Sequence, residues 1–390
     1  MQKRKVLFVI HQLNFGGVQK SLMPALNAID YSENEVTLYI QKDRLDLLPQ
    51  VNKNVSKIII NHDKTHYYRK PYSVFLLTRM KIRGMLKKDI TDLNDKLKHY
   101  VLKKQMDYEL KHNFNIEERF DVAVSYIQRF SAQFVADYIK ADRKIMFFHG
   151  STDEEHELHQ RIMANFDKIM CVSKGVQEVL SALYPDYSDK MDYIENYVDI
   201  NDIEEKSKAF RVDVPSDKLI LCSCGRFTTV KGFDIAVDAA KELKDKGVDF
   251  VWYFVGDGVE RADIEKRINF NNLNDNIIIT GMQENPYPYL RCCHIYVQPS
   301  REEAHPLSLI EAKLLLKPVV TTATVGGKTI INHDISGKIA DINANSIADS
   351  ILSLNNDKQL YQSIVANLKA IDYLEDLIRY KKKWNDLLKG

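Results

Sequence analysis

The chain has 390 residues, of which 55 are Lys or Arg and 54 are Asp or Glu, so its net charge is +1. This length predicts two domains with a core each, and so balanced a charge gives no reason to expect a nucleic-acid partner. The 5 cysteines form no pair of CxxC motifs, so the sequence predicts neither a disulfide framework nor a zinc site.

Apolar runs are short throughout the chain. The first covers residues 6–10 only, which is too short for the core of a signal peptide. No run approaches the ~20 residues that cross a bilayer. We therefore expect a cytoplasmic protein, either in solution or peripheral on the inner face of the cell membrane.

The first half of the chain opens as a strand, a glycine turn and a helix. The strand is expected at residues 5–10 and the helix at 18–29, with Gly16 and Gly17 between them. Further buried strands are expected at residues 35–40, 57–60, 122–126, 144–148 and 168–172. Strands that alternate with helices predict a parallel, doubly wound sheet.

The turn at Gly16 and Gly17 carries neither a Walker motif nor a complete GxGxxG fingerprint, so a dinucleotide site is not supported. Two adjacent glycines suit a turn in which backbone amides approach an anion or a sugar hydroxyl. The alternative is a tight strand-to-helix turn without a ligand.

A basic segment interrupts this half. Residues 64–111 hold 13 Lys and Arg against 5 Asp and Glu, a local charge of +8, and aromatic and aliphatic residues interleave with them. A basic amphipathic helix of this kind suits an anionic membrane surface. The alternative is a helical insertion, at about residues 64–118, whose apolar stripe packs on its own domain while its charges are solvated.

His149 follows the strand expected at residues 144–148. Ligands of open α/β sheets bind beyond the carboxyl ends of the strands, so this imidazole is well placed for a ligand crevice. The alternative is a residue next to a helix cap with no part in chemistry.

The second half repeats the opening of the first. Strands are expected at residues 219–224, 250–255, 277–280, 294–298 and 318–322, with a helix at 233–243. A polar stretch at 201–217 is the expected linker between the domains. We predict an N-terminal domain at 1–200, a C-terminal domain at 201–370 and a terminal helix at 371–390 that returns to the N-terminal domain, after an interruption near Asp372.

The loop after the strand at 219–224 combines glycines with two cations. Gly225 allows a close backbone approach, and Arg226 and Lys231 are spaced to bind two adjacent phosphates. The next helix adds the positive end of its dipole. Two solvated surface cations are the alternative interpretation.

Two carboxylates bracket an apolar run after the strand at 294–298. Glu303 is expected on the loop that leaves this strand, and Glu311 about two turns into the following helix. Both positions are on the side of the sheet where a ligand crevice is expected.

In their joint order these features resemble family 4 of the retaining GT-B glycosyltransferases. The resemblance covers about residues 5–340 and is carried by short motifs in the order of the family: Gly16-Gly17, Val172-Ser173-Lys174, Asn196-Tyr197-Val198-Asp199, Gly225-Arg226-Phe227, Lys231-Gly232, Gly256-Asp257-Gly258, and Glu303 with Glu311. The resemblance implies two doubly wound, Rossmann-like domains that face each other across a cleft.

The resemblance also implies roles. Arg226 and Lys231 would bind the donor diphosphate and neutralise the leaving group, Glu303 would bind the hydroxyls of the donor sugar, and Glu311 those of the ribose. The expected catalytic residues are Arg226, Lys231, Glu303 and His149. The expected donor-binding residues are Gly16, Gly17, Gly225, Gln283, Ala304, His305, Pro306, Leu307 and Glu311. No metal ion or other cofactor is expected.

The chain departs from the family pattern at Ala304-His305, where the family most often has Gly-Phe. This departure concerns the identity of the donor sugar, not the class of reaction. His305 either contacts the sugar or the phosphates, or packs beneath the loop.

The function implied is a retaining transfer of a sugar from a nucleotide diphosphate, expected to be a UDP-sugar, to a glycan or lipid-linked acceptor in cell-envelope or capsule polysaccharide synthesis. A nucleotide-sugar epimerase with the same fold and a non-catalytic partner subunit are the alternatives.

Overall fold

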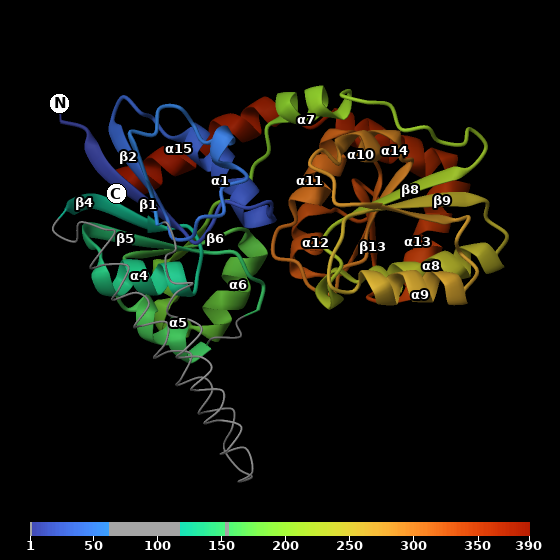
Figure 1. The fold of residues 1–390 in the computed structure, drawn as a ribbon, viewed down its shortest axis with the longest axis horizontal. Helices are drawn as coiled ribbons and strands as arrows, with labels where there is room; N and C mark the ends of the chain where they lie inside the picture. Colours follow the sequence, from blue (N-terminus) through green and yellow to red (C-terminus); the bar gives the residue numbers. More distant parts are fainter. Residues whose placement is uncertain (1, 62–117, 153–155) are drawn as a thin grey trace, which may run out of the picture. The chain divides into compact units, whose positions relative to one another are not determined.

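The computed structural model describes residues 2–61, 118–152 and 156–390 (Figure 1). The basic segment at 64–111 lies outside the described residues, as does most of the insertion predicted at 64–118. By their contacts the described residues form two compact units. One holds the residues up to 148, 156–170 and 385–390, and the other holds 149–152 and 171–384.

The first sheet has seven strands in the order β3-β2-β1-β4-β5-β6-β7. Strand β1 pairs in parallel with β2 on one side and with β4 on the other. The strands are β1 Arg4–Ile10, β2 Asn34–Ile40, β3 Lys57–Ile60, β4 Arg119–Ser125, β5 Lys140–Phe148, β6 Lys168–Cys171 and β7 Met191–Tyr193. The helices that accompany it are α1 Gly17–Ala28, α4 Phe130–Tyr138, α5 His156–Met163 and α6 Lys174–Leu183.

The second sheet has six parallel strands in the order β10-β9-β8-β11-β12-β13. They are β8 Leu219–Cys224, β9 Phe250–Val255, β10 Ile277–Gly281, β11 Ile295–Gln298, β12 Val319–Thr322 and β13 Gly337–Ala340. The helices of this part are α7 Ile200–Ser207, α8 Phe233–Asp245, α9 Arg261–Phe270, α10 Tyr287–Cys292, α11 Leu307–Leu314, α12 Val325–Ile330, α13 Ala344–Asn356, α14 Lys358–Lys369 and α15 Tyr373–Lys389.

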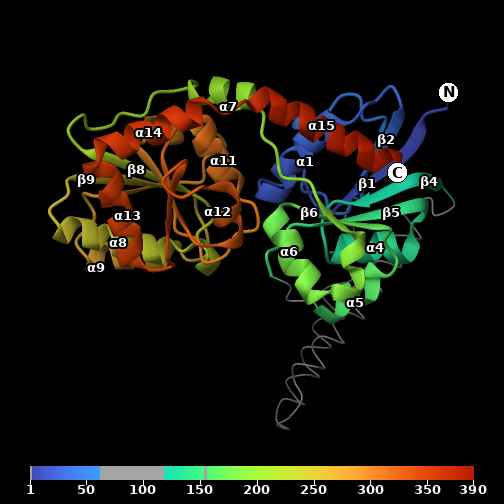
Figure 2. The ribbon, with the colours of Figure 1, turned by 180° about the vertical axis from the view of Figure 1, so that it is seen from behind.

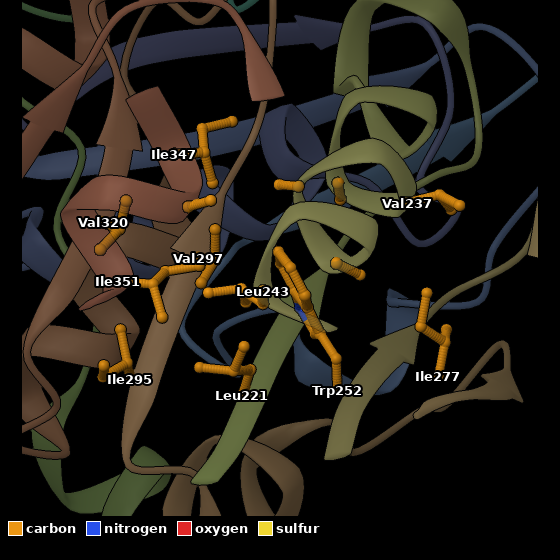
Figure 3. Close-up of a cluster of buried hydrophobic side chains, with 14 of the residues drawn as sticks. Leu221, Val237, Leu243, Trp252, Ile277, Ile295, Val297, Val320, Ile347 and Ile351 are labelled. Carbon is orange, nitrogen blue, oxygen red and sulfur yellow. The ribbon is translucent and has the colours of Figure 1, made fainter. Parts of the chain in front are cut away.

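Strand β9 shows why this sheet is covered on both faces, since all six of its residues are buried. Successive side chains of a strand point to opposite faces. Trp252 and Phe254 pack with α8, α9 and α13, whereas Val251 and Tyr253 pack with the layer that holds α10 and α11. Figures 1 and 2 show α8 beside α13, and Figure 3 shows Trp252 between the strands and these helices.

Buried polar atoms of this core are paired. The indole nitrogen of Trp252 donates a hydrogen bond of 3.0 Å to the hydroxyl of Ser223, which in turn donates to the carbonyl of Val297 at 2.6 Å. Because an unpaired buried donor costs free energy, this chain of bonds permits a tryptophan in the centre of the sheet.

The strands expected in the described parts of the chain are confirmed, and their ends differ by a few residues at most. Two short strands, β7 and β13, were not predicted, and the segment expected to be a linker at 201–217 contains most of α7. The terminal helical region is interrupted as expected, because α14 ends at Lys369 and α15 begins at Tyr373. Within the described residues, no helix combines the length and the apolar character that crossing a bilayer requires.

Candidate functional site

The second sheet changes its winding direction between β8 and β11. From β8 the chain passes to β9 on one side, and from β11 it passes to β12 on the other, while β8 and β11 pair directly. The loops that follow both strands therefore leave the same edge of the sheet from neighbouring positions. Ligands of doubly wound folds bind at such a switch point.

A buried polar cluster joins these two loops. The ammonium of Lys231 lies 2.6 Å from Oε1 of Glu303, although 72 residues separate them. The same oxygen accepts hydrogen bonds from the Gln298 amide at 2.8 Å and from the Ser300 hydroxyl at 2.7 Å. Three donors thus converge on one carboxylate oxygen, which fixes the orientation of a side chain that is only 9% exposed.

The second oxygen of Glu303 has no hydrogen-bond partner among the described residues. A carboxylate with one oxygen fixed and one left open is a preorganised acceptor for a hydroxyl group. The structure thereby leaves one carboxylate oxygen of Glu303 available to accept a hydrogen bond from a ligand hydroxyl.

Glycine places Lys231 at this site. Residues Thr229–Lys231 form one 3-10 turn, and the next residue, Gly232, has φ +65°. A Cβ at Gly232 would lie 2.1 Å from the carbonyl oxygen of Pro299. Only glycine allows this left-handed conformation at such a close approach, so the loop after β8 packs directly on the loop after β11.

Arg226 differs from Lys231 in having an exposed side chain. Within the described parts of the chain, its guanidinium makes no ion pair and no hydrogen bond. A planar cation without a partner, next to Gly225 at the edge of the sheet, is suited to forked hydrogen bonds with a phosphate.

Glu311 is buried and accepts a hydrogen bond of 3.0 Å from the hydroxyl of Tyr287. Burial and the neighbouring carboxylate raise the pKa of Tyr287, so its hydroxyl stays protonated as a donor. Helix α11 begins at Leu307, and Glu311 is therefore about one turn into it rather than two. The expectation of two turns was wrong because Pro306 delays the start of the helix.

Tyr287 is expected to orient Glu311, and the variant Tyr287→Phe tests this. If Glu311 binds the ribose of the nucleotide that the family resemblance implies, loss of this hydrogen bond should weaken binding of that nucleotide about 3- to 10-fold, with little loss of turnover at saturation. Titration calorimetry with the nucleoside diphosphate would measure the effect. An unchanged affinity would show that the hydroxyl does not matter to Glu311.

The loop from Glu303 to Leu307 is held through three consecutive carbonyl groups. The amide of Gly326 donates to the carbonyl of Glu303 at 2.8 Å, Ser173 Oγ to that of Ala304 at 3.2 Å, and Asn196 Nδ2 to that of His305 at 3.2 Å. The amides of Ala304, His305 and Leu307 have no acceptor among the described residues. Backbone donors without an acceptor, at the start of a helix, suit an anionic ligand.

Ser173 and Asn196 belong to motifs of the sequence, but no role was predicted for either side chain. The short family motifs around them were their only signal in the sequence. The structure makes both of them supports of the loop at 303–307.

His305 belongs to this loop and is buried. Burial, with a smaller effect of Lys313, lowers the pKa of His305 to about 3, so its imidazole is neutral at neutral pH. Its side chain lines a cavity together with Glu195 and Lys313.

The remaining predicted residues are Gln283, His149, Gly16 and Gly17. Gln283 follows β10 and donates to the carbonyl of Thr280 at 2.9 Å. His149 directly follows β5, as expected. Gly16 precedes α1 in an extended conformation and Gly17 opens that helix, in the other compact unit, and a Cβ at Gly17 would meet no atom within 4 Å.

Among the residues that the structure describes, no group of three or more His, Cys, Asp or Glu side chains is arranged to hold a metal ion. The expectation that no metal is needed stays a prediction.

Comparison with known proteins assigns part of the chain. Residues 204–370 match the family model described as Glycosyl transferases group 1. The matched stretch contains Arg226, Lys231, Glu303 and Glu311 and therefore includes the polar cluster.

Curated relatives match the chain over part of its length. An uncharacterized glycosyltransferase, MJ1178, of Methanocaldococcus jannaschii is 30% identical over 53% of this chain and 54% of its own. The lipopolysaccharide core biosynthesis glycosyltransferase LpsE of Rhizobium meliloti is 27% identical over 50% of this chain and 56% of its own. The chain thus spans about half the length of these relatives.

Solved structures match the whole chain. The complex of Anabaena Alr3699/HepE with UDP superposes with a TM-score of 0.69 at 16% identity, covering 99% of both chains. A glycosyltransferase from Rickettsia africae has a TM-score of 0.68 at 20% identity, covering 100% of this chain and 98% of its own. The fold class is therefore confirmed as GT-B, with two α/β, Rossmann-like domains built on parallel sheets.

Proposed function

We propose that this chain is a retaining glycosyltransferase of the family 4 type. It would transfer a sugar from a nucleotide diphosphate to a glycan or lipid-linked acceptor in cell-surface polysaccharide synthesis. The observation that carries the proposal is the convergence of Lys231 and Glu303 at the β8–β11 switch point, beside the unpaired guanidinium of Arg226.

The two cations would receive the diphosphate. Arg226 would bind it through the donors that are unpaired in the described structure, and Lys231 would turn from Glu303 toward the oxygen that becomes the leaving group. A fixed positive charge at that oxygen stabilises the negative charge that develops as the glycosidic bond breaks. Because these side chains would supply the charge, we expect activity to persist in EDTA.

The two carboxylates would bind the two sugars of the donor. The open oxygen of Glu303 would accept a hydroxyl of the transferred sugar, and Glu311, oriented by Tyr287, would accept the hydroxyls of the ribose. The unpaired amides of the loop at 303–307 would lie against the phosphates. We infer retention of the anomeric configuration from the family resemblance.

UDP is the nucleotide proposed. The HepE complexes contain UDP and, in one case, UDP-glucose. LpsE is named for lipopolysaccharide core biosynthesis, and WclY of Escherichia coli for O-antigen biosynthesis. These names support a UDP-sugar donor and a cell-surface glycan as acceptor for this chain.

A panel of nucleotide sugars tests the proposal. We expect one donor, and the free nucleoside diphosphate, to raise the thermal unfolding temperature, and we expect slow hydrolysis of that donor. NMR of the first-formed product would then show the donor's own anomeric configuration. Epimerised donor without transfer would favour the epimerase, and binding of no nucleotide at all would favour the non-catalytic subunit.

Arg226→Ala is expected to weaken binding of the nucleoside diphosphate about 10-fold or more, because a charge-assisted, forked contact is lost. The variant should fold normally, since Arg226 is exposed and supports no neighbour. Titration calorimetry with UDP would measure the change, and Arg211→Ala, an exposed arginine elsewhere in this unit, is the matched control. Equal affinities of the two variants would contradict the assignment.

A further inference from the structure

A cavity of about 200 Å³ borders the loop at 303–307, since His305 of this loop lines it. It is bordered by the segment that follows β7, by α11 and the end of α12, and by α15. Its polar lining residues include Glu195, Asn196, His305, Lys313, Tyr373 and Arg379. None of these except His305 belongs to the proposed donor site.

Two side chains of the cavity carry polar atoms that are buried without a hydrogen-bond partner within the described residues. These atoms are the hydroxyl of Tyr373 and Nδ1 of His305. Burial, with Asp376, raises the pKa of Tyr373 to about 12, so this hydroxyl is a donor that lacks an acceptor. A buried donor without an acceptor costs free energy, and a ligand oxygen would recover it.

Lys313 adds a buried charge. Its ammonium donates to the carbonyl of Ile330 at 3.1 Å and has no carboxylate within ion-pair distance among the described residues. Burial lowers the pKa of Lys313, and only the more distant charges of Asp376 and Glu195 oppose this. A mostly buried ammonium that bonds to a neutral carbonyl is a site for a counter-ion.

The remaining charges of the cavity also favour an anion. Arg379 and Lys383 join Lys313, against the carboxylates of Glu195 and Asp376. Asp376 is already paired with Arg379, and Glu195 and Arg379 are both exposed to solvent, so the buried charge of the cavity is that of Lys313. Arg379 uses one nitrogen for that pair and keeps further donors for a ligand.

We propose that this cavity is a binding site for a small metabolite with an oxyanion group, phosphate or carboxylate, held by Lys313, Tyr373 and Arg379. Its volume suits a ligand no larger than a monosaccharide phosphate. Apolar side chains, among them Ile310, Leu314 and Ile330, also line the cavity and would contact the body of the ligand.

The cavity also borders a side chain that supports the loop at 303–307. Asn196 lines the cavity and donates to the carbonyl of His305, so it borders both the ligand and the loop at 303–307. The inference itself does not depend on the proposed function, because Lys313 and Tyr373 have no part in the donor site.

Binding of inorganic phosphate and of malonate to the full chain tests this inference, by calorimetry at constant ionic strength set with sodium chloride. We expect saturable binding of at least one of them. It should weaken about 10-fold or more in Lys313→Met and about 3- to 10-fold in Tyr373→Phe. Phosphate alone would identify a phosphate-bearing ligand, and malonate would identify a carboxylate.

Three further variants serve as controls for this experiment. Lys266→Met removes an exposed lysine of α9 and should leave phosphate binding unchanged. Lys231→Ala should weaken UDP but not phosphate at the cavity. Lys313→Arg keeps the charge and should keep part of the affinity for phosphate. This variant still tests the site if Lys313→Met does not fold.

Two results would overturn the inference. One is the absence of saturable binding of either anion to the native chain. The other is phosphate binding that is lost in Lys231→Ala and kept in Lys313→Met, because the anion would then occupy the diphosphate site alone. If UDP does not bind, this counts against the proposed function only. The measured binding of phosphate or malonate at the cavity would still decide the inference made here.

Discussion

Replacement of Lys231 by alanine is expected to reduce turnover about 100- to 1,000-fold, as removal of one preorganised donor to a developing charge does in other enzymes. The ammonium lies 2.6 Å from Oε1 of Glu303 and would stabilise the leaving diphosphate in the transition state. Removing the ammonium destabilises the transition state more than the ground-state complex. The factor by which kcat falls should therefore exceed the factor by which KM rises.

The measurement is the initial rate of sugar transfer, or of donor hydrolysis, at saturating donor. Lys231→Arg, which keeps the charge but changes its shape, should recover part of the rate, and Lys266→Ala should have no effect. The stability change should stay small because the side chain of Lys231 is 30% exposed and Glu303 keeps the donors Gln298 and Ser300. Full activity of Lys231→Ala would contradict the proposal that Lys231 stabilises the leaving diphosphate.

The sequence was sufficient for most of the sheets because their strands are buried on both faces. The six residues of β9, Phe250–Val255, are all apolar, and such a run has few alternatives to a buried strand. The strands β7 and β13 have only three and four residues and carry polar or glycine residues, so no periodicity could develop. Helix α7 was hidden because polar residues dominate its exposed face.

The residues of the site were within reach of sequence reasoning, but their contacts were not. Lys231 and Glu303 were placed on loops at the same edge of a sheet, and the resemblance implied a task for each. That they bond directly follows from the pairing of β8 with β11, which no local pattern encodes. The supports from Ser173 and Asn196, and the cavity beside Lys313, depend in the same way on packing between distant segments.

Gly256→Ala is the second change for which we expect a large effect. Gly256 follows β9 with φ +155°, a backbone conformation that side chains rarely adopt. A Cβ there would lie 1.9 Å from the carbonyl oxygen of Gly225, the residue just before Arg226. Either the end of β9 or the loop after β8 must move. We therefore expect a loss of about 2–4 kcal/mol in the free energy of unfolding.

The same displacement should weaken UDP binding about 10-fold or more, because a shift of about 1 Å in the loop after β8 would move Arg226 away from the diphosphate. Urea unfolding and titration calorimetry with UDP would measure the two effects.

Gly247→Ala is the matched control for Gly256→Ala. Gly247 also has a left-handed backbone, with φ +75°, but a Cβ there would meet no atom within 4 Å. It should therefore carry the backbone cost alone, about 1–2 kcal/mol, and leave UDP affinity unchanged. If the two variants lose the same stability and keep the same affinity, the contact between Gly256 and Gly225 does not position the loop. A larger loss in Gly256→Ala, coupled to weaker UDP binding, would show that the close approach of these two glycines holds Arg226 at the diphosphate.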